Sequence, residues 1–311
     1  SGLKGLNVCE DQIGTPVGTL GIPEFGTRFV RQMLVDTKPK SFSDLVRISG
    51  LSHGTNVWSN NAQELIKEGV TDLSGVIATR DDIMSYLLRK GLEADDAFRL
   101  MEQVRKGKGL SDQDRKLLQG FEIPQWYLES CDKISYMFPK AHAVAYVMMA
   151  FRIAYFKVHY PAEFYAALFS LRPGDFDAHL ISQGEQKVRR QLLLIAEKGP
   201  KATAKERTVA TLLEIVLEAM ARDIKFLPVD LYKSSEKSFQ IEEGGLLPPL
   251  AALQGIGGSA AANIVRARRE GDFISIEDLR QKSGVTKAVI DALRQHGSLA
   301  GLPETNQLTL F

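Results

Sequence analysis

The chain has 311 residues, of which 44% are hydrophobic and 25% charged, and it carries 39 Lys and Arg against 38 Asp and Glu. At about 150 residues per domain, this length predicts two domains or one large domain with appendages. These ordinary fractions exclude a disordered polymer, collagen and a coiled-coil rod. Cys9 and Cys131 are too few for a disulfide framework or a zinc cluster, so a reducing interior is the simpler setting.

The sequence contains no run of about 18 uninterrupted apolar residues, which excludes a helical membrane span. Its longest apolar stretch, residues 141–150, is closed by Arg152 and Lys157. The chain starts at Ser1 without a signal or transit peptide, which indicates a piece of a longer protein.

Residues 1–25 are rich in Gly and Pro and are predicted to be an irregular lead-in. Helical spacing of apolar residues dominates residues 26–223. Within this range Pro139 opens a long apolar helix that runs to Pro161 and is expected to be buried and central. Further helices are expected over residues 176–198 and 203–222.

The pattern shortens to β-type alternation at residues 224–226 and 238–241, where residues 242–245 resemble a hairpin turn. Residues 224–245 are therefore expected to form a β-containing connector between the helical part and a small domain over residues 246–302. The predicted fold class is mainly α with a minor β-hairpin.

A glycine elbow followed by a basic helix is the first candidate site, made of Gly255, Ile256, Gly257, Gly258, Arg266, Arg268 and Arg269. Glycines at a helix junction let the backbone approach a ligand and leave the N–H groups of the next helix free for an anion. Basic residues downstream favour a phosphate of a nucleic-acid strand. The pattern resembles the helix-hairpin-helix family.

Residues 284–287, which include Lys287, are a degenerate second copy of the elbow, and two copies would grip both strands of a duplex across the minor groove. Two other interpretations are open. Gly255, Gly257 and Ala260 fit the loose dinucleotide fingerprint, although that requires a βαβ unit for which little chain remains. The elbow could also be a tight turn between core helices.

The second candidate site is the start of the long apolar helix. Residues 133–160 hold four Lys and Arg residues but no Asp or Glu. A proline at the first helical position leaves the first-turn N–H groups free, with Lys140 and His142 beside them, which suits phosphate oxygens. Tyr146 lies one turn beyond His142, where a ring could meet a base. The alternative is a satisfied, partly buried His142 and a core Tyr146.

Residues 138–146 (FPKAHAVAY) and 157–164 (KVHYPAEF) resemble the fingers segment of bacterial C-family DNA polymerases, the DNA polymerase III alpha subunits. The PolC-type branch is resembled in particular by residues 21–27 (GIPEFGT), 48–58 (ISGLSHGTNVW), 80–84 (RDDIM) and 104–110 (VRKGKGL). The similarity runs in the family's order from about residue 14 to the end.

The resemblance implies fingers over residues 26–223, the connector, a tandem helix-hairpin-helix domain over 246–302 and a tail over 303–311. In the family, the palm carries the carboxylates that bind Mg²⁺, and this chain starts after the palm. No cofactor is expected on this piece, which should be inactive alone. Asp175 and Asp177 form a D-x-D pair, but their position predicts a helix cap.

The resemblance also implies roles for individual side chains. Nucleotide or template contacts are expected from Lys140, His142, Tyr146, Arg80, Arg105, Lys106, Lys108, Ser52 and His53. For Arg105, Lys106 and Lys108 the alternative is a solvated helix end, and for Ser52 and His53 it is a simple cap. Thr55 lies in the same Gly-flanked turn as Ser52 and His53.

The last five residues resemble the pentapeptide by which bacterial polymerases bind the sliding clamp, with Gln307, Leu308, Leu310 and Phe311 as its contacts. An amide would fix the register while the apolar side chains fill a cleft, and the polar residues before them would act as a leash. The alternative is that the peptide docks back on its own domain.

The sequence is therefore interpreted as a fragment of a replicative DNA polymerase of the bacterial cytoplasm. The expected partners are primer-template DNA, the incoming deoxynucleoside triphosphate (dNTP), the sliding clamp and other replisome subunits, without a membrane. The alternative is a noncatalytic adaptor in which residues 246–311 link duplex DNA to a clamp.

Overall fold

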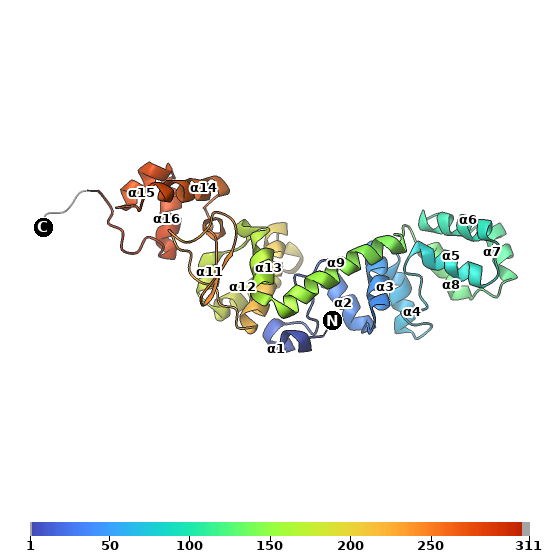
Figure 1. The fold of residues 1–311 in the computed structure, drawn as a ribbon. Coiled ribbons are helices and arrows are strands. Elements are labelled where there is room, and N and C mark those ends of the chain that lie inside the picture. The colour runs from blue at the N-terminus through green and yellow to red at the C-terminus, as the bar shows by residue number, and fades with distance from the viewer. Residues whose placement is uncertain (1, 307–311) are drawn as a thin grey trace. The chain divides into compact units, whose positions relative to one another are not determined.

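The computed structural model describes residues 2–306. Within this range the protein forms sixteen α-helices and one two-stranded antiparallel hairpin (Figure 1), which confirms the predicted fold class. None of the described helices combines the length and the apolar character that a membrane span needs. Two compact units make up the chain: Thr19–Ala154, and Gly2–Gly18 together with the residues from Tyr155 onward.

The first unit is entirely helical apart from loops and an irregular turn at Trp58–Ala62. Its helices are α2 (Arg28–Thr37), α3 (Phe42–His53), α4 (Gln63–Lys67), α5 (Arg80–Arg89), α6 (Ala94–Arg105), α7 (Asp112–Gln119), α8 (Gln125–Lys133) and the first part of α9 (Lys140–His159). Capping boxes fix some of these starts. Ser41 caps α3 with Asp44, and Ser111 caps α7 with Asp114, each pair exchanging two hydrogen bonds.

The second unit combines helices with the hairpin. Its α-helices are the end of α9, α1 (Glu10–Ile13), α10 (Pro161–Ser170), α11 (Ala178–Ser182), α12 (Glu185–Glu197), α13 (Ala204–Ala221), α14 (Gly258–Ala267), α15 (Ile276–Ser283) and α16 (Lys287–His296). Strands β1 (Gln240–Glu242) and β2 (Gly245–Leu247) pair antiparallel, so the turn lies inside the predicted residues 242–245. Short 3-10 turns occur at Lys4–Leu6, Pro173–Asp175, Gly199–Lys201, Leu250–Ala252 and Arg268–Glu270.

Residues 2–18 are more ordered than the irregular lead-in that their Gly and Pro content predicts. They contain α1, which packs against α13, and they bury Leu6, Ile13 and Val17. Burial of apolar side chains therefore holds this segment on the second unit despite its helix-breaking composition.

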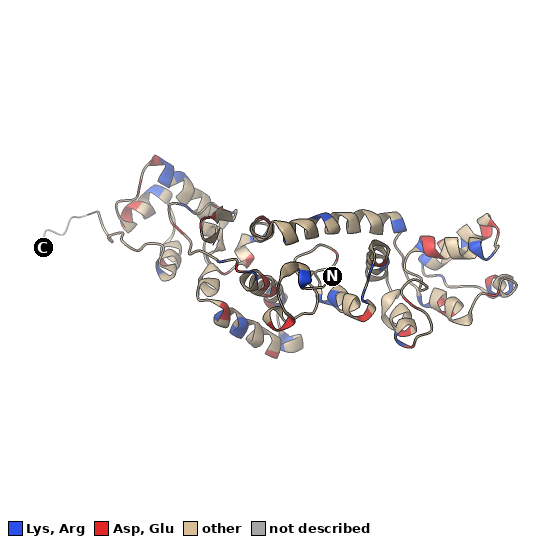
Figure 2. Ribbon diagram, turned by 60° about the horizontal axis from the view of Figure 1, so that its bottom comes forward, with Lys and Arg blue, Asp and Glu red and all other residues tan. Residues whose placement is uncertain are grey.

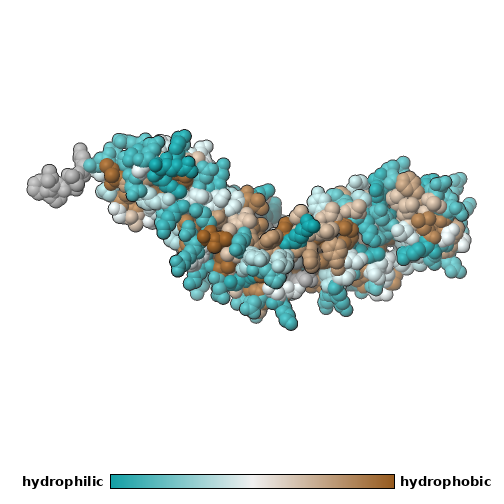
Figure 3. All heavy atoms as spheres, viewed as in Figure 1, coloured by the Kyte–Doolittle hydropathy of each residue, from teal (hydrophilic) through white to brown (hydrophobic). Residues whose placement is uncertain are grey.

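Helix α9 has the predicted bounds, but the prediction that it is buried is wrong. Only Ala143, Val147, Ala150 and the side chain of Lys157 are fully covered along it. The large apolar side chains of α9 are 38 to 61% exposed, namely Tyr146, Met148, Met149, Phe151, Tyr155, Phe156 and Val158. Figure 2 shows α9 as a mostly uncharged helix, and Figure 3 shows apolar surface over much of it.

The helical region predicted over residues 176–198 consists of two helices, α11 and α12. Gly184 takes a φ of +93° between α11 and α12, a conformation that ends one helix and starts the next. The predicted helix over residues 203–222 is confirmed as α13, which begins with a capping box between Thr203 and Glu206.

A buried ion pair joins α9 to α13 within the second unit. The Nζ of Lys157 lies 2.7 Å from the Oε1 of Glu218, and the two side chains are 1% and 0% exposed. Tyr165 on α10 donates from its hydroxyl to the same Oε1 at 2.7 Å, and Lys157 also donates to the Gly18 carbonyl at 3.0 Å. Lys157, one of the four basic residues within 133–160, is thus buried in the interior.

Candidate functional site

The loop of residues 134–139 connects α8 to α9 and contacts the ends of three other helices of the first unit. Thr55, just after α3, forms an antiparallel bridge with Tyr136. The Met137 N–H donates to the carbonyl of Arg105 at the end of α6, at 3.3 Å. At the start of α5 the Arg80 N–H donates to the Phe138 carbonyl, also at 3.3 Å. The loop then leads into α9, so segments far apart in sequence meet around it.

An aromatic cluster fills the space between the end of α3 and the first turn of α9. The Phe138 ring stacks on His142 with 5.1 Å between centroids, and His142 lies 4.4 Å from the ring of Tyr146. The ring of His53 lies 5.5 Å from Phe138 and 6.0 Å from His142. Tyr146 is 49% exposed, so the alternative that it belongs to the core is wrong.

His53 is held in a fixed orientation. Its Nδ1 lies 2.8 Å from the Ser49 carbonyl, and its Nε2 lies 3.1 Å from a carboxylate oxygen of Glu24. The Ser52 hydroxyl donates to the Ser49 carbonyl at 2.9 Å. Ser52 and His53 therefore close the end of α3, as their alternative interpretation predicts, while the His53 ring lies next to His142.

Three predicted phosphate contacts converge on one carboxylate, and we call Arg80, Arg105 and Lys106 around Glu102 the cation cluster. Arg105 donates to both oxygens of Glu102, Lys106 Nζ lies 3.0 Å from it, and an Arg80 guanidinium nitrogen lies 3.8 Å away. Hydrogen bonds from Arg105 and Lys106 hold the pKa of Glu102 at about 2, so it is ionised at neutral pH.

The first turn of α9 differs from its prediction. Pro139 precedes the helix, and the Lys140 N–H donates to a carboxylate oxygen of Asp81 at 2.6 Å. One of the amides expected to be free for phosphate is thus already occupied by an acid on α5. The Lys140 side chain is exposed and makes no hydrogen bond or ion pair with any described residue.

Lys108 stands apart from this arrangement. Its side chain is exposed beyond the end of α6 and contacts no charged group in the described part of the chain, as a solvated helix end would. Sequence reasoning missed Glu102, Asp81 and Phe138. The spacing of Glu102 from Arg105 and Lys106, three and four residues, is a signal that could have found the first of these.

The second unit contains two hairpin turns with similar backbone geometry, formed by residues 254–257 and 283–286. In the first, Gly255 has a φ of +91°, Ile256 is buried, and Gly257 is the N-cap of α14. In the second, Gly284 has a φ of +64°, Val285 is buried, and Thr286 is the N-cap of α16. The predicted second copy of the elbow therefore repeats the first.

Neither α14 nor α16 has a side-chain cap. On α16 the Val289 N–H donates to the Thr286 carbonyl at 3.1 Å, so the N–H groups that can face a ligand there are those of Lys287 and Ala288.

Lys287 is exposed at the start of α16, whereas Arg266 and Arg269 are exposed at the far end of α14 and just beyond it. Arg268 donates to the Leu231 carbonyl at 2.7 Å. Burial lowers the pKa of Arg268. Sequence reasoning missed Lys237, whose Cε lies 3.3 Å from the place that a Cβ on Gly258 would occupy.

Residues 303–306, expected to be part of a leash, are fastened to the start of α15. The Ile276 and Glu277 N–H groups donate to the carbonyls of Pro303 and Glu304 at 2.9 and 3.1 Å. Arg294 on α16 also pairs with Glu304 at 2.9 Å. The predicted clamp contacts Gln307, Leu308, Leu310 and Phe311 lie outside the described residues.

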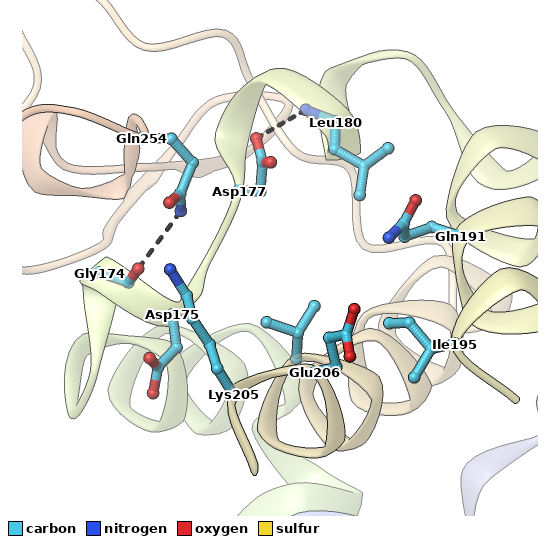
Figure 4. Close-up of a pocket in the computed structure, with 10 residues that line it drawn as sticks. Gly174, Asp175, Asp177, Leu180, Gln191, Ile195, Lys205, Glu206 and Gln254 are labelled. Atoms are coloured by element: carbon cyan, nitrogen blue, oxygen red, sulfur yellow. Dashed lines mark hydrogen bonds between the residues drawn. The ribbon is translucent and has the colours of Figure 1, made fainter. Parts of the chain in front are cut away.

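A cavity of about 300 Å³ lies beside the first hairpin (Figure 4). Gln254 donates across it to the carbonyls of Gly174 and Phe176, both at 3.3 Å. Asp177 caps α11 by accepting from the Leu180 N–H, as predicted for the D-x-D pair. No group of three or more His, Cys, Asp or Glu side chains among residues 2–306 could hold a metal ion.

Comparisons with known families identify two regions of the chain. Residues 14–122 match the bacterial DNA polymerase III alpha subunit finger domain, and residues 223–308 match the helix-hairpin-helix motif. The chain is therefore the finger and helix-hairpin-helix region of a bacterial DNA polymerase III alpha subunit.

Curated relatives define the branch of this family. The chain is 53% identical to the PolC-type DNA polymerase III of Caldanaerobacter subterraneus over 99% of its length. It is 56% identical to that of Clostridium perfringens over 98%, and 53% identical to that of Bacillus subtilis over 100%. The chain belongs to the PolC-type DNA polymerase III family, and it spans 21 to 22% of the length of these relatives.

Proposed function

We propose that this chain positions the incoming dNTP and the template in a replicative DNA polymerase, grips the product duplex and tethers the enzyme to the sliding clamp. The parent enzyme would form phosphodiester bonds by attack of the primer 3′ hydroxyl on a dNTP. Primer-template DNA, the clamp and other replisome subunits are its proposed partners in the bacterial cytoplasm.

The observation that carries the nucleotide role is the convergence of cations and rings around residues 134–139. Lys140 and the cation cluster offer positive charge, since Arg80, Arg105 and Lys106 share the single carboxylate of Glu102 and the Lys140 side chain is exposed. Phe138, His142 and Tyr146 offer aromatic surface beside the start of α9. Phosphates and a base need these two kinds of surface side by side.

The observation that supports the duplex role is the repeated hairpin geometry. Two helix starts with uncapped N–H groups, each preceded by a glycine at positive φ, can each approach a phosphate of the DNA backbone. Lys287 and Lys237 add positive charge near these starts, and Arg266 and Arg269 add it at the far end of α14. Arg268 is left out of this proposed contact set because it donates into the protein.

We assign no metal ligand among residues 2–306. The D-x-D pair is the one carboxylate motif that the sequence offered, and Asp177 is engaged as a helix cap. The Mg²⁺ that the PolC family implies for the full enzyme would bind to the palm, and the 311-residue chain should not polymerise alone.

The nucleotide role can be tested in the full-length polymerase. Replacing Lys140 and His142 by Ala should raise the KM for dNTP by about tenfold, because charge and ring surface at the triphosphate would be lost. Lys133→Ala is the control, since Lys133 at the end of α8 is paired with Glu64 on α4. The measurement is single-nucleotide incorporation against dNTP concentration, and an unchanged KM in the double variant would reject the role.

The same experiment separates the polymerase from the adaptor alternative. An adaptor that only links DNA to a clamp through residues 246–311 would leave the nucleotide requirement untouched. For the tail, deletion of residues 307–311 should abolish clamp pull-down while sparing extension on short primers. Retained pull-down would assign clamp binding to another part of the enzyme.

A further inference from the structure

The Glu102 carboxylate forms ion pairs with basic side chains at the ends of two helices, α5 and α6. It lies in the last turn of α6, one turn before Arg105 and Lys106, and it also reaches Arg80, the first residue of α5. Its side chain is 20% exposed, while that of Lys106 is 50% exposed. Glu102 is thus more enclosed than one of the cations it holds.

Backbone hydrogen bonds fasten the cation cluster to the loop that precedes α9. The Arg105 carbonyl accepts from Met137, and the Arg80 N–H donates to Phe138. Gly107 allows this close approach, because a Cβ there would collide with the carbonyl of Ser135. The backbones of Arg80 and Arg105 are therefore held by the loop, and their guanidinium groups lie next to Glu102.

We propose that Glu102 is a positioning residue that holds Arg80, Arg105 and Lys106 in the arrangement that binds the anionic phosphates of the incoming nucleotide. This inference rests on the nucleotide role proposed above. Free Arg and Lys side chains lose rotamer freedom when they bind a ligand, and a carboxylate that already orders them removes that cost from the binding step.

The opposite role would be competition, in which Glu102 occupies the cations and must release them before phosphate binds. The geometry favours positioning. Arg80 lies at 3.8 Å, an ion pair rather than a hydrogen bond, so its N–H groups stay available, and Lys106 keeps half of its side chain in solvent. Three cations against one carboxylate also leave a net positive charge for the ligand.

The test uses the full-length polymerase with Glu102→Ala and Glu102→Gln. Glu102→Ala should raise the KM for dNTP by about fivefold with kcat within about twofold, and Glu102→Gln, which can still accept a hydrogen bond, should have a smaller effect. Glu64→Ala is the matched control, because it removes a carboxylate from an exposed ion pair with Lys133 and should change neither constant.

A double-variant cycle distinguishes a role through the cations from a merely structural one. Because Glu102 acts partly through Arg105, the variant that combines Glu102→Ala with Arg105→Ala should raise the KM by less than the product of the two single effects. A lower KM in either Glu102 variant would establish competition and overturn the proposal. An unchanged KM in Glu102→Ala, with a raised KM in Arg105→Ala, would overturn it while leaving the nucleotide role intact. If Arg105→Ala and Lys106→Ala also leave KM unchanged, the nucleotide role of the cluster fails with it.

Discussion

Lys157 and Glu218 show how a single buried charge depends on its partner. Both side chains are excluded from solvent, and Tyr165 and the Gly18 carbonyl complete their hydrogen bonds. Burial, reinforced by the Glu218 charge, raises the pKa of Tyr165, so its hydroxyl remains a donor. A buried ion pair adds little over an apolar pair of the same volume, but a charge left without its partner is strongly destabilising.

Glu218→Gln should therefore lower the free energy of unfolding by about 3 to 5 kcal/mol, because it leaves the Lys157 ammonium buried beside a neutral amide. Adding Lys157→Met should recover much of this loss, since the amide can still accept from Tyr165. Urea unfolding of the 311-residue chain and both variants measures the difference. A double variant less stable than Glu218→Gln would contradict the buried-charge explanation.

His296 at the end of α16 predicts a dependence of stability on pH. Its Nε2 accepts from the Val229 N–H at 2.9 Å, which requires a neutral ring. Desolvation, with a smaller contribution from His179, lowers the pKa of His296 below its ordinary value of 6.5, against an opposing contribution from Asp177. The unfolded chain therefore binds more protons, so the stabilisation is complete above pH 6.5 and is lost as the pH falls below that value.

The measurement is the free energy of unfolding between about pH 5 and pH 7.5 for the wild-type chain and His296→Gln. The wild-type chain should lose stability more steeply towards low pH, because the glutamine side chain of the variant does not titrate. Equal slopes in the two proteins would show that another group is responsible.

At the scale of elements, the first hairpin offers a substitution that separates folding from binding. Gly257 has φ −73° and ψ 161°, which any residue can adopt, and a Cβ there would have no atom within 4 Å. Asp is a preferred N-cap, so Gly257→Asp should leave α14 as stable as before or more so. Its carboxylate would, however, stand where a phosphate is proposed to bind.

Gly257→Asp should therefore weaken duplex binding by at least about tenfold while the unfolding midpoint stays level or rises. Gly257→Asn is the control, because it caps the helix without a charge and should lose less affinity. Fluorescence anisotropy with a labelled duplex gives the affinities. Unchanged binding by Gly257→Asp would remove the first hairpin from the DNA contacts.

Several elements follow directly from local sequence, and others depend on tertiary contacts that local sequence does not encode. The starts of α13 and α9 lie within a residue of the predicted ones, at Thr203 and at the proline before Lys140. The exposure of Phe151 and Met149 on α9 was not predictable, since hydropathy records that a face is apolar but not what covers it. The break at Gly184 was missed because apolar spacing continues across it.

In the candidate sites, too, some features follow from local sequence and others depend on tertiary contacts. Each cation was identified from its own motif, but the sequence could not show that Arg80 shares a carboxylate with Arg105, since they are joined only by the packing of α5 on α6. Arg268 fits the basic-helix pattern as well as Arg266 does, and only its contact with Leu231 separates them. Side-chain direction is set by tertiary neighbours rather than by spacing.

At the scale of the whole molecule, a net charge of +1 cannot by itself attract DNA. Any affinity for a duplex must come from where the cations lie, and we expect it to fall steeply with salt as bound phosphates release their counterions. Log–log plots of the binding constant of the 311-residue chain against salt should have a slope of about −0.9 for each phosphate contacted.

Two triple variants separate local from global charge. Replacing Arg266, Arg269 and Lys287 by Ala should reduce both the affinity and the magnitude of the salt slope, because these exposed cations on α14, just beyond it and on α16 are the proposed phosphate contacts. Replacing the exposed Lys67, Lys116 and Lys201 by Ala removes the same charge from elsewhere and should change the slope little. Equal losses in the two variants would mean that exposed cations anywhere on the chain contribute alike to DNA binding, and the hairpins would then have no special role in it.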